Sequence, residues 1–185
     1  MEVPAPGEAV AEDMAELGKY VRDVLKLNQK ARNFRIFAPD EALSNKLTAA
    51  FEPSHPRWHA EPCSTDEGLS ADGRIRDSMR SEHMCQGWLE GYLLTGRHGF
   101  LNSYEAFIRI VDSMVSQHAK WLKVARQLPR RQDIAPMTYV LSSNVWQPDH
   151  NALTHQDPGF LGPVANHKPA LVSHYVPPYA DPSRP

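Results

Sequence analysis

Residues 81–100, SEHMCQGWLEGYLLTGRHGF, place a carboxylate at the start of an amphipathic helix that directly follows an extended segment. The apolar positions predict a helix over residues 84–95, and Gly96 is the residue expected to end it. In open α/β sheets, ligands bind where strands end and helices begin, because free backbone amides point there. Glu82 would therefore stand at the mouth of a ligand site.

The first half of the chain shows one helix pattern and one strand pattern. Residues 9–29 carry a single apolar stripe, which predicts a helix, and residues 34–38 predict a short strand that ends before a proline. A short helix over residues 44–51 would begin at a Ser or Asn N-cap. Residues 52–77 are rich in Pro and Gly, so we expect a long surface excursion, with Trp58 as its anchor.

The second half continues this alternation. Asn102 and Glu105 resemble a capping box, which predicts a long helix over residues 103–127. Residues 134–143 are apolar and β-branched, as in a strand buried on both faces, and residues 170–176 suggest one more strand. The succession predicts an α/β fold, with a mostly parallel sheet flanked by helices.

Composition narrows the class of protein. The chain has 185 residues and a formal net charge of −2, which gives no electrostatic reason to expect a nucleic acid partner. No apolar run approaches the ~20 residues of a membrane-spanning helix, so neither a membrane partner nor a secretory signal is expected. Two cysteines, Cys63 and Cys85, are interpreted as inert small hydrophobes, and a cytoplasmic location is the simplest prediction.

Four long motifs occur in a specific order: FRIFAPDEALSNKL, SEHMCQGWLEGYLLTGRHGF, YEAFIRIVDSMVSQHAKWLK and DHNALTHQDPGF. With them the chain resembles the phosphoketolases, over residues 3–178. The resemblance implies a carbon–carbon lyase of carbohydrate metabolism that cleaves xylulose 5-phosphate or fructose 6-phosphate with inorganic phosphate, giving acetyl phosphate and an aldose phosphate. It also implies three parts: a linker and leading helix over 1–33, a partial pyrimidine-binding domain over 34–178, and a divergent tail over 179–185.

The same resemblance implies thiamine diphosphate as the cofactor, with Mg²⁺ held by a domain that this chain lacks. Phosphoketolases are several times longer, so the chain resembles a fragment covering the start of the middle, pyrimidine-binding domain. A homodimer, or association with the missing domains, is expected, and the isolated fragment is expected to be inactive. The alternative is a noncatalytic truncated remnant or interaction module that associates with an intact phosphoketolase.

By resemblance, Glu82 is the catalytic carboxyl that engages the aminopyrimidine ring of the cofactor. That role needs burial, which raises a carboxyl pKa toward neutrality; the alternative is a solvated glutamate that interacts with the helix dipole. Glu41 would join the carboxylates near the cofactor, or serve only as a loop acid. Phe100, Tyr104 and Phe107 could enclose the aminopyrimidine, with Tyr104 favoured as the contact and Phe107 as core.

The substrate side of the site is implied by the same motifs. Ser44 would bind phosphate, unless it is only a helix N-cap. His150, Asn151 and His155 would donate hydrogen bonds to sugar hydroxyls and phosphate oxygens, and His155 would also be catalytic. The alternative for this loop is a plain polar surface, and a metal site is not expected because no Cys lies near enough to complete one.

Four positions, residues 80, 147, 148 and 152, depart from the family pattern. Residues 146–150 read Trp-Gln-Pro-Asp-His where the family has Trp-Arg-Gln-Asp-His, so Pro148 replaces a substrate-contacting Gln. Ala152 stands where a Gly is usual. Arg80 replaces an apolar residue, and an ion pair with Glu82 would lower the pKa of that carboxyl.

Overall fold

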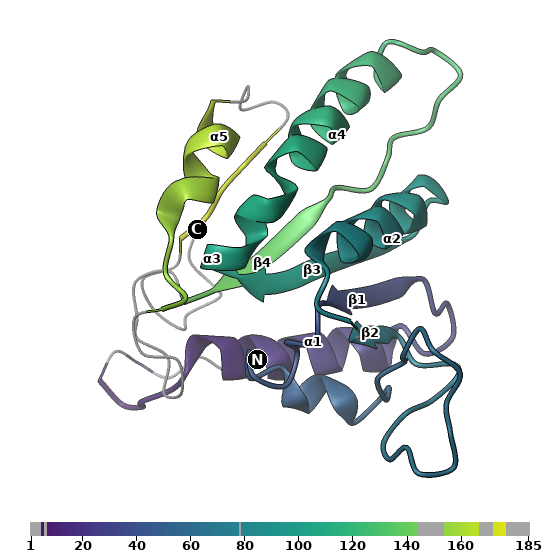
Figure 1. The fold of residues 1–185 in the computed structure, drawn as a ribbon, viewed down its shortest axis with the longest axis vertical. Helices are drawn as coiled ribbons and strands as arrows, with labels where there is room; N and C mark the ends of the chain where they lie inside the picture. The colour runs from purple at the N-terminus through teal and green to yellow at the C-terminus, as the bar shows by residue number, and fades with distance from the viewer. Residues whose placement is uncertain (1–4, 6, 78, 144–153, 167–171, 177–185) are drawn as a thin grey trace.

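The computed structural model describes residue 5 and residues 7–77, 79–143, 154–166 and 172–176. Within these residues the chain forms a four-stranded sheet with helices on both faces (Figure 1). The expected fold class is therefore confirmed. None of the helices in the described part of the chain is both long enough and apolar enough to cross a membrane.

All four strands run parallel, in the order β2-β1-β3-β4. They are β1 (Phe34–Ala38), β2 (Ile75–Asp77), β3 (His98–Tyr104) and β4 (Thr138–Ser142). Because parallel strands all end at the same edge of a sheet, their carboxyl ends gather the segments that follow them. This edge therefore holds the residues after Ala38, Asp77, Tyr104 and Ser142.

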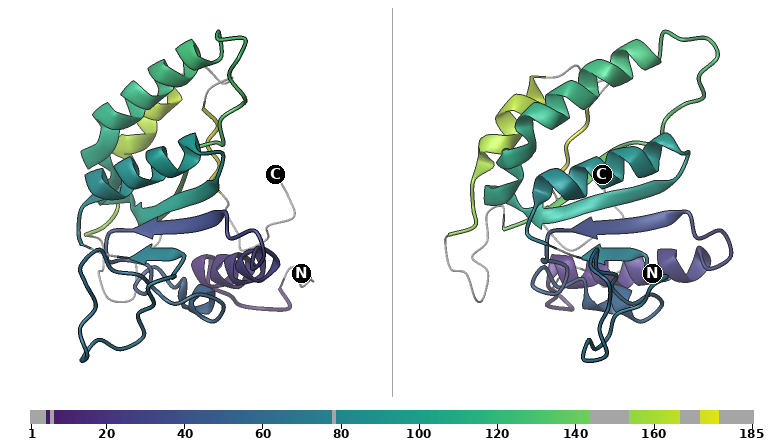
Figure 2. Two further views of the ribbon diagram at one scale, coloured as in Figure 1. Left: turned by 90° about the vertical axis from the view of Figure 1, so that its right-hand side faces the viewer. Right: turned by 45° about the vertical axis from the view of Figure 1, so that its right-hand side comes forward.

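Two cores form on the two faces of the sheet, and Figure 2 shows α1 and α2 on opposite sides of the strands. The first lies under α1 (Asp13–Leu27) and η1 (Thr48–Phe51), where Val21 and Leu25 pack against β1. The second lies under the remaining helices. These are α2 (Glu82–Leu94), α3 (Glu105–Ile108), η2 (Arg109–Val111), α4 (Asp112–Ala125), η3 (Pro158–Phe160) and α5 (Leu161–Ala165).

A buried arginine joins the segment before β2 to the first helix. Arg74 is 1% exposed, and its guanidinium donates to the carbonyl oxygens of Leu25 at 2.9 Å and Asn28 at 3.3 Å. These carbonyls belong to the last turn of α1 and its end, where helical partners are missing. Arg74 thus satisfies the helix end and fixes α1 against β2.

Local sequence patterns predicted the first elements well. The strand at 34–38 is confirmed as β1. The helix predicted over 9–29 is confirmed as α1, which is shorter and spans Asp13–Leu27. The predicted helix over 84–95 is α2, which begins at Glu82 and is followed by Gly96 with φ +77°. That left-handed φ is the conformation in which glycine commonly ends a helix.

The predicted helix over 103–127 is wrong in its first part. Residues 98–104 form β3, the central strand, and helical structure starts only at Glu105, with a 3-10 turn before α4. The N-cap of α3 is Tyr104, without a side-chain hydrogen bond, so the capping box is not formed. β3 is buried because β1 and β4 pair on both sides of it, and helices cover both faces.

Four further predictions need correction. The excursion over 52–77 ends in β2, and Trp58 is 51% exposed, so it is not a buried anchor for this segment. The short helix begins at Thr48, after a turn. β4 starts only at Thr138 and is exposed to half-buried, because it lies at the edge of the described sheet. Residues 172–176 form no strand.

Candidate functional site

Three acidic side chains meet at the carboxyl edge of the sheet. Glu41 lies in the loop after β1, Asp77 is the last residue of β2, and Glu82 is the first residue of α2. Ala38 and Asp77 are paired in the sheet register, so the loop that leaves β1 starts beside the end of β2. The expected arrangement of a strand end followed by a helix N-terminus is therefore present.

Glu82 is buried, with 7% of its surface exposed. Ser81 is the N-cap of α2, and its hydroxyl accepts the amide of Met84 at 3.3 Å. Glu82 therefore sits in the first turn, where the helix dipole favours a negative charge. This burial does not agree with the alternative interpretation of Glu82 as a solvated glutamate at the helix start.

Glu41 is the carboxyl whose pKa is raised most toward neutrality at this edge. It is 9% exposed, and it accepts the backbone amide of Tyr104 at 3.2 Å. Burial, and next the negative charge of Glu82, raise the pKa of Glu41 to about 7, while the Tyr104 amide partly offsets the rise. The raised pKa expected at this site is therefore found at Glu41, which would share or exchange a proton near neutral pH.

Asp77 is an acidic residue of the site that the sequence analysis missed. Its carboxylate accepts the backbone amide of Glu41 at 2.9 Å and that of Ala42 at 3.3 Å. Burial raises the pKa of Asp77 to about 6, although the backbone amides oppose this. The signal was the alternation in Arg74-Ile75-Arg76-Asp77, three residues before the Ser-Glu-His motif, which is typical of a strand ending in an acid.

Aromatic rings stand beside these acids. Tyr104 is 4% exposed, and its ring meets those of Phe107 and His155 edge-to-face, with centroids 5.8 and 4.6 Å away. Phe107 also packs on His155 at 4.9 Å but is 36% exposed, so the interpretation of Phe107 as core is wrong. Phe100 lies elsewhere, in the core under α1, against Phe34 at 6.1 Å.

The segment that carries His155 is fixed to the start of α3. The amide of Ala106 donates to the carbonyl of His155 at 3.1 Å, and the amide of Asp157 donates to Glu105 at 3.1 Å. Asp157 also forms an ion pair with Arg109 at 3.3 Å. His155 is thus placed at the same edge as the acids. His150 and Asn151 lie outside the described residues, as do Pro148 and Ala152.

Two further residues have contacts that bear on the predictions. The hydroxyl of Ser44 donates to the carbonyl of Glu41 at 3.2 Å, inside the loop after β1, so the structure brings Ser44 to the same edge. The side chain of Arg80 is 86% exposed and pairs with Asp40 at 3.4 Å. The ion pair between Arg80 and Glu82 is therefore not formed, because Arg80 turns toward the loop after β1.

Both thiols are free, but their surroundings differ. Cys85 is fully buried, and burial followed by the charges of Glu82, Asp77 and Glu41 raises the pKa of its thiol to about 12. The burial and the raised pKa of Cys85 both favour the inert role that was expected for it. Cys63 is exposed, so its interpretation as an inert small hydrophobe does not match its surroundings.

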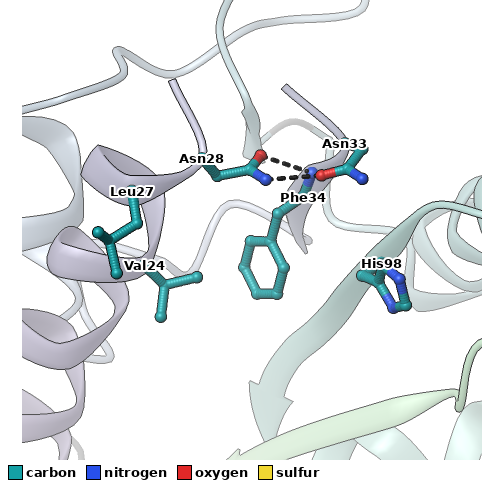
Figure 3. A pocket seen from close by; sticks show the side chains of 6 residues that line it. All are labelled: Val24, Leu27, Asn28, Asn33, Phe34 and His98. Carbon is teal, nitrogen blue, oxygen red and sulfur yellow. Dashed lines mark hydrogen bonds between the residues drawn. The ribbon is translucent and has the colours of Figure 1, made fainter. Parts of the chain in front are cut away.

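The carboxyl edge must be distinguished from a hollow at the opposite edge of the sheet (Figure 3). This hollow of about 390 Å³ lies between the end of α1 and the starts of β1 and β3, and it is lined by Val24, Leu27, Asn28, Asn33, Phe34 and His98. None of the residues that line it is an acid. Within the described residues, no three His, Cys, Asp or Glu side chains are grouped to hold a metal ion.

The fold and this edge define an α/β domain with a candidate ligand site, in which acids and aromatic rings gather where parallel strands end. Residues 15–182 match the family described as D-xylulose 5-phosphate/D-fructose 6-phosphate phosphoketolase. The chain belongs to this family.

Curated relatives are similar over nearly the whole chain but are much longer. A probable phosphoketolase of Clostridium acetobutylicum is 62% identical over 178 residues, which are 96% of this chain and 22% of that protein. Those of Bradyrhizobium diazoefficiens and Nitrosospira multiformis are 55% and 52% identical over 181 residues, covering 98% of this chain and 22% of each relative. The chain thus spans about a fifth of the length of these relatives.

Proposed function

We propose that this chain supplies the acidic, pyrimidine-binding side of a thiamine diphosphate site in a phosphoketolase. The reaction would be the cleavage of xylulose 5-phosphate or fructose 6-phosphate with inorganic phosphate to acetyl phosphate and an aldose phosphate. The observation that carries the proposal is the pair of buried carboxyls, Glu41 and Glu82, with Glu41 bonded to the amide of Tyr104, whose ring packs against Phe107.

The residues present fit the aminopyrimidine part of such a cofactor. A flat heteroaromatic ring needs an apolar surface to lie on and a carboxyl that can share a proton with a ring nitrogen. Phe107 and Tyr104 offer the first, and Glu82 at the buried start of α2 offers the second. When bound, thiamine diphosphate would supply the electron sink needed to break a carbon–carbon bond.

The side chains of this chain would divide the remaining work. Glu82 would hold the aminopyrimidine through a shared proton, and Glu41 would keep a second proton available near neutral pH. His155 and Ser44, at the same edge, would contact the sugar phosphate or inorganic phosphate. His150 and Asn151 are assigned to the same role from their place in the motif DHNALTHQDPGF alone.

The site would be completed by parts of the longer relatives that lie outside the span matched by this chain. Residues 34–178 would form a partial pyrimidine-binding domain, after a leading segment over 1–33 and before a divergent tail over 179–185. The Mg²⁺ and diphosphate contacts would come from another domain, in a homodimer or an association with the missing phosphoketolase domains. The isolated chain is therefore expected to produce no acetyl phosphate.

The test is the thermal unfolding midpoint of the purified chain with and without thiamine diphosphate and Mg²⁺. A ligand that binds only the native state raises the midpoint, so we expect a rise for the wild type and none for Glu82→Gln. Glu61→Gln, an exposed glutamate in the excursion, is the matched control and should keep the rise. An unchanged wild-type midpoint at saturating cofactor would contradict the proposal.

A second candidate function is an interaction module that associates with an intact phosphoketolase. It is favoured by the position of β4, whose outer edge pairs with no strand in the described part of the chain. An unpaired strand edge is a surface on which further strands add. Co-purification with an intact phosphoketolase tests this function, and the absence of a complex would remove it.

A further inference from the structure

The loop that carries Glu41 has a backbone that must be held in place. Asp40 directly precedes Glu41, and Lys46 lies five residues after Glu41. Their φ values are +66° and +61°, and neither residue is a glycine. Side chains other than glycine adopt this left-handed region at a cost, so surrounding contacts have to stabilise it. A contact next to Glu41 must therefore hold this part of the loop.

Asp77 is bonded to this loop at the point where the chain turns. Its carboxylate accepts the amides of Glu41 at 2.9 Å and Ala42 at 3.3 Å. Ala38 is paired with Asp77 in the sheet, so the carboxylate acts only a few residues after β1 ends. Charge-assisted bonds to consecutive amides are stronger and shorter than neutral ones.

Glu41 is held from two sides as a result. Its backbone is bonded to the end of β2 through Asp77, and its carboxylate is bonded to the end of β3 through the amide of Tyr104. Farther along the loop, Asn45 accepts the hydroxyl of Ser142 from β4. The loop is thus attached to the ends of three strands, and Asp77 is the attachment next to Glu41.

We propose that Asp77 is a positioning residue that holds the carboxyl of Glu41 at the carboxyl edge, facing Glu82. The role in cofactor binding rests on the proposed function, but the effect on Glu41 does not. Asp77 acts in two ways, because it fixes the backbone of Glu41 and its negative charge also acts on the Glu41 carboxyl. A plain structural turn residue would do only the first.

The experiment is a titration of the Glu41 carboxyl by ¹³C NMR, with the resonance assigned through its loss in Glu41→Gln. The charged groups that face Glu41 are Glu82 from α2 and Asp77 from β2. In the wild type we expect a midpoint near 7. Asp77→Asn removes a negative charge that raises the pKa of Glu41, so the midpoint should fall. The variant also places an amide donor against a backbone amide, which weakens its hold on the loop.

Two further variants make the result specific. Asp77→Glu restores the negative charge and should bring the midpoint back toward the wild-type value. Asp72→Asn makes the same change of charge on the approach to β2, at a side chain that is 81% exposed, and should leave the midpoint unchanged. An unchanged Glu41 midpoint in Asp77→Asn, or an equal fall in Asp72→Asn, would overturn the proposal.

A measurement on the wild type covers the case in which Asp77→Asn fails to fold. The backbone amide proton shifts of Glu41 and Ala42 should change with a midpoint near 6, the pKa of Asp77. Amide shifts without that inflection would contradict the proposal.

Cofactor binding is measured separately. With thiamine diphosphate and Mg²⁺, Asp77→Asn should show a smaller rise in unfolding midpoint than the wild type. A wild type without any rise removes the proposed function, while the Glu41 titration still decides the role of Asp77.

Discussion

The carboxylate of Glu41 accepts the backbone amide of Tyr104 at 3.2 Å, which joins the loop after β1 to the last residue of β3. The bond brings a buried acid to the strand end that also carries the ring cluster of Tyr104, Phe107 and His155. Acidic and aromatic groups from distant segments therefore share one edge of the sheet.

The titration of Glu41 predicts a pH dependence of stability. Its pKa in the folded chain is about 7, above the ordinary value of 4.5, so its contribution is fully present below pH 4.5 and is lost as the pH rises through 7. The free energy of unfolding should fall by about 3 kcal/mol over that range from Glu41. Urea unfolding at several pH values measures this.

Glu41→Gln isolates the contribution of that one carboxyl. Gln keeps an oxygen for the Tyr104 amide but cannot ionise, so the variant should gain stability over the wild type above pH 7. The exposed control Glu61→Gln should follow the wild-type curve. Parallel curves for wild type and Glu41→Gln would show that Glu41 titrates at an ordinary pKa.

Replacing Arg74 should destabilise the chain at every pH. Arg74→Met keeps much of the apolar stem but leaves the carbonyls of Leu25 and Asn28 without these donors. Loss of a buried hydrogen-bond partner costs about 1–3 kcal/mol, and urea unfolding should show a lower midpoint. The matched control is Arg80→Met, at a side chain that is 86% exposed, where a change within about 0.5 kcal/mol is expected. Equal effects in the two variants would contradict the role of Arg74 at the end of α1.

The two thiols should react very differently with a disulfide reagent. Cys63 is exposed, whereas Cys85 is buried and burial raises the pKa of its thiol to about 12. Since the thiolate is the reactive form, one fast thiol is expected in the native chain and a second only after unfolding. Cys63→Ser should remove the fast phase. Fast labelling of Cys85 in that variant would mean that α2 opens readily.

Phe107 should matter more for the cofactor than for the fold. Phe107→Ala loses edge-to-face contacts with Tyr104 and His155, worth about 0.5–1.5 kcal/mol. The rise in unfolding midpoint caused by thiamine diphosphate and Mg²⁺ should be largely lost. Phe34→Leu, at the opposite edge of the sheet, removes a contact with Phe100 and should keep the rise. A full rise in Phe107→Ala would exclude Phe107 from the site.

Several parts of the fold could be predicted because their signals are local. The apolar stripe of α1, the apolar run of β1 and the glycine after α2 depend only on neighbours within a few residues. The motif around Glu82 also predicted a helix start beside a strand end. Periodicity and capping chemistry are short-range properties, so the sequence carries them directly.

β3 could not be predicted in this way. Its residues His98–Tyr104 include Gly and Asn, which are weak strand formers, and Asn102 instead resembles the cap of a helix. They form a strand because β1 and β4 supply hydrogen-bond partners on both sides. A central strand is therefore decided by neighbours that are distant in sequence.

By itself, then, the sequence determined the main helices, the first strand, the α/β class and the motifs that place the chain in its family. Only the tertiary structure decided which acids meet, since Glu41, Asp77 and Glu82 come together through the pairing of β1 with β2 and the packing of α2. Only the structure showed that burial and Glu82 raise the pKa of Glu41, and that Asp77 accepts the backbone amide of Glu41. The reason is that desolvation and charge proximity depend on distance in space, which a linear pattern of residues does not contain.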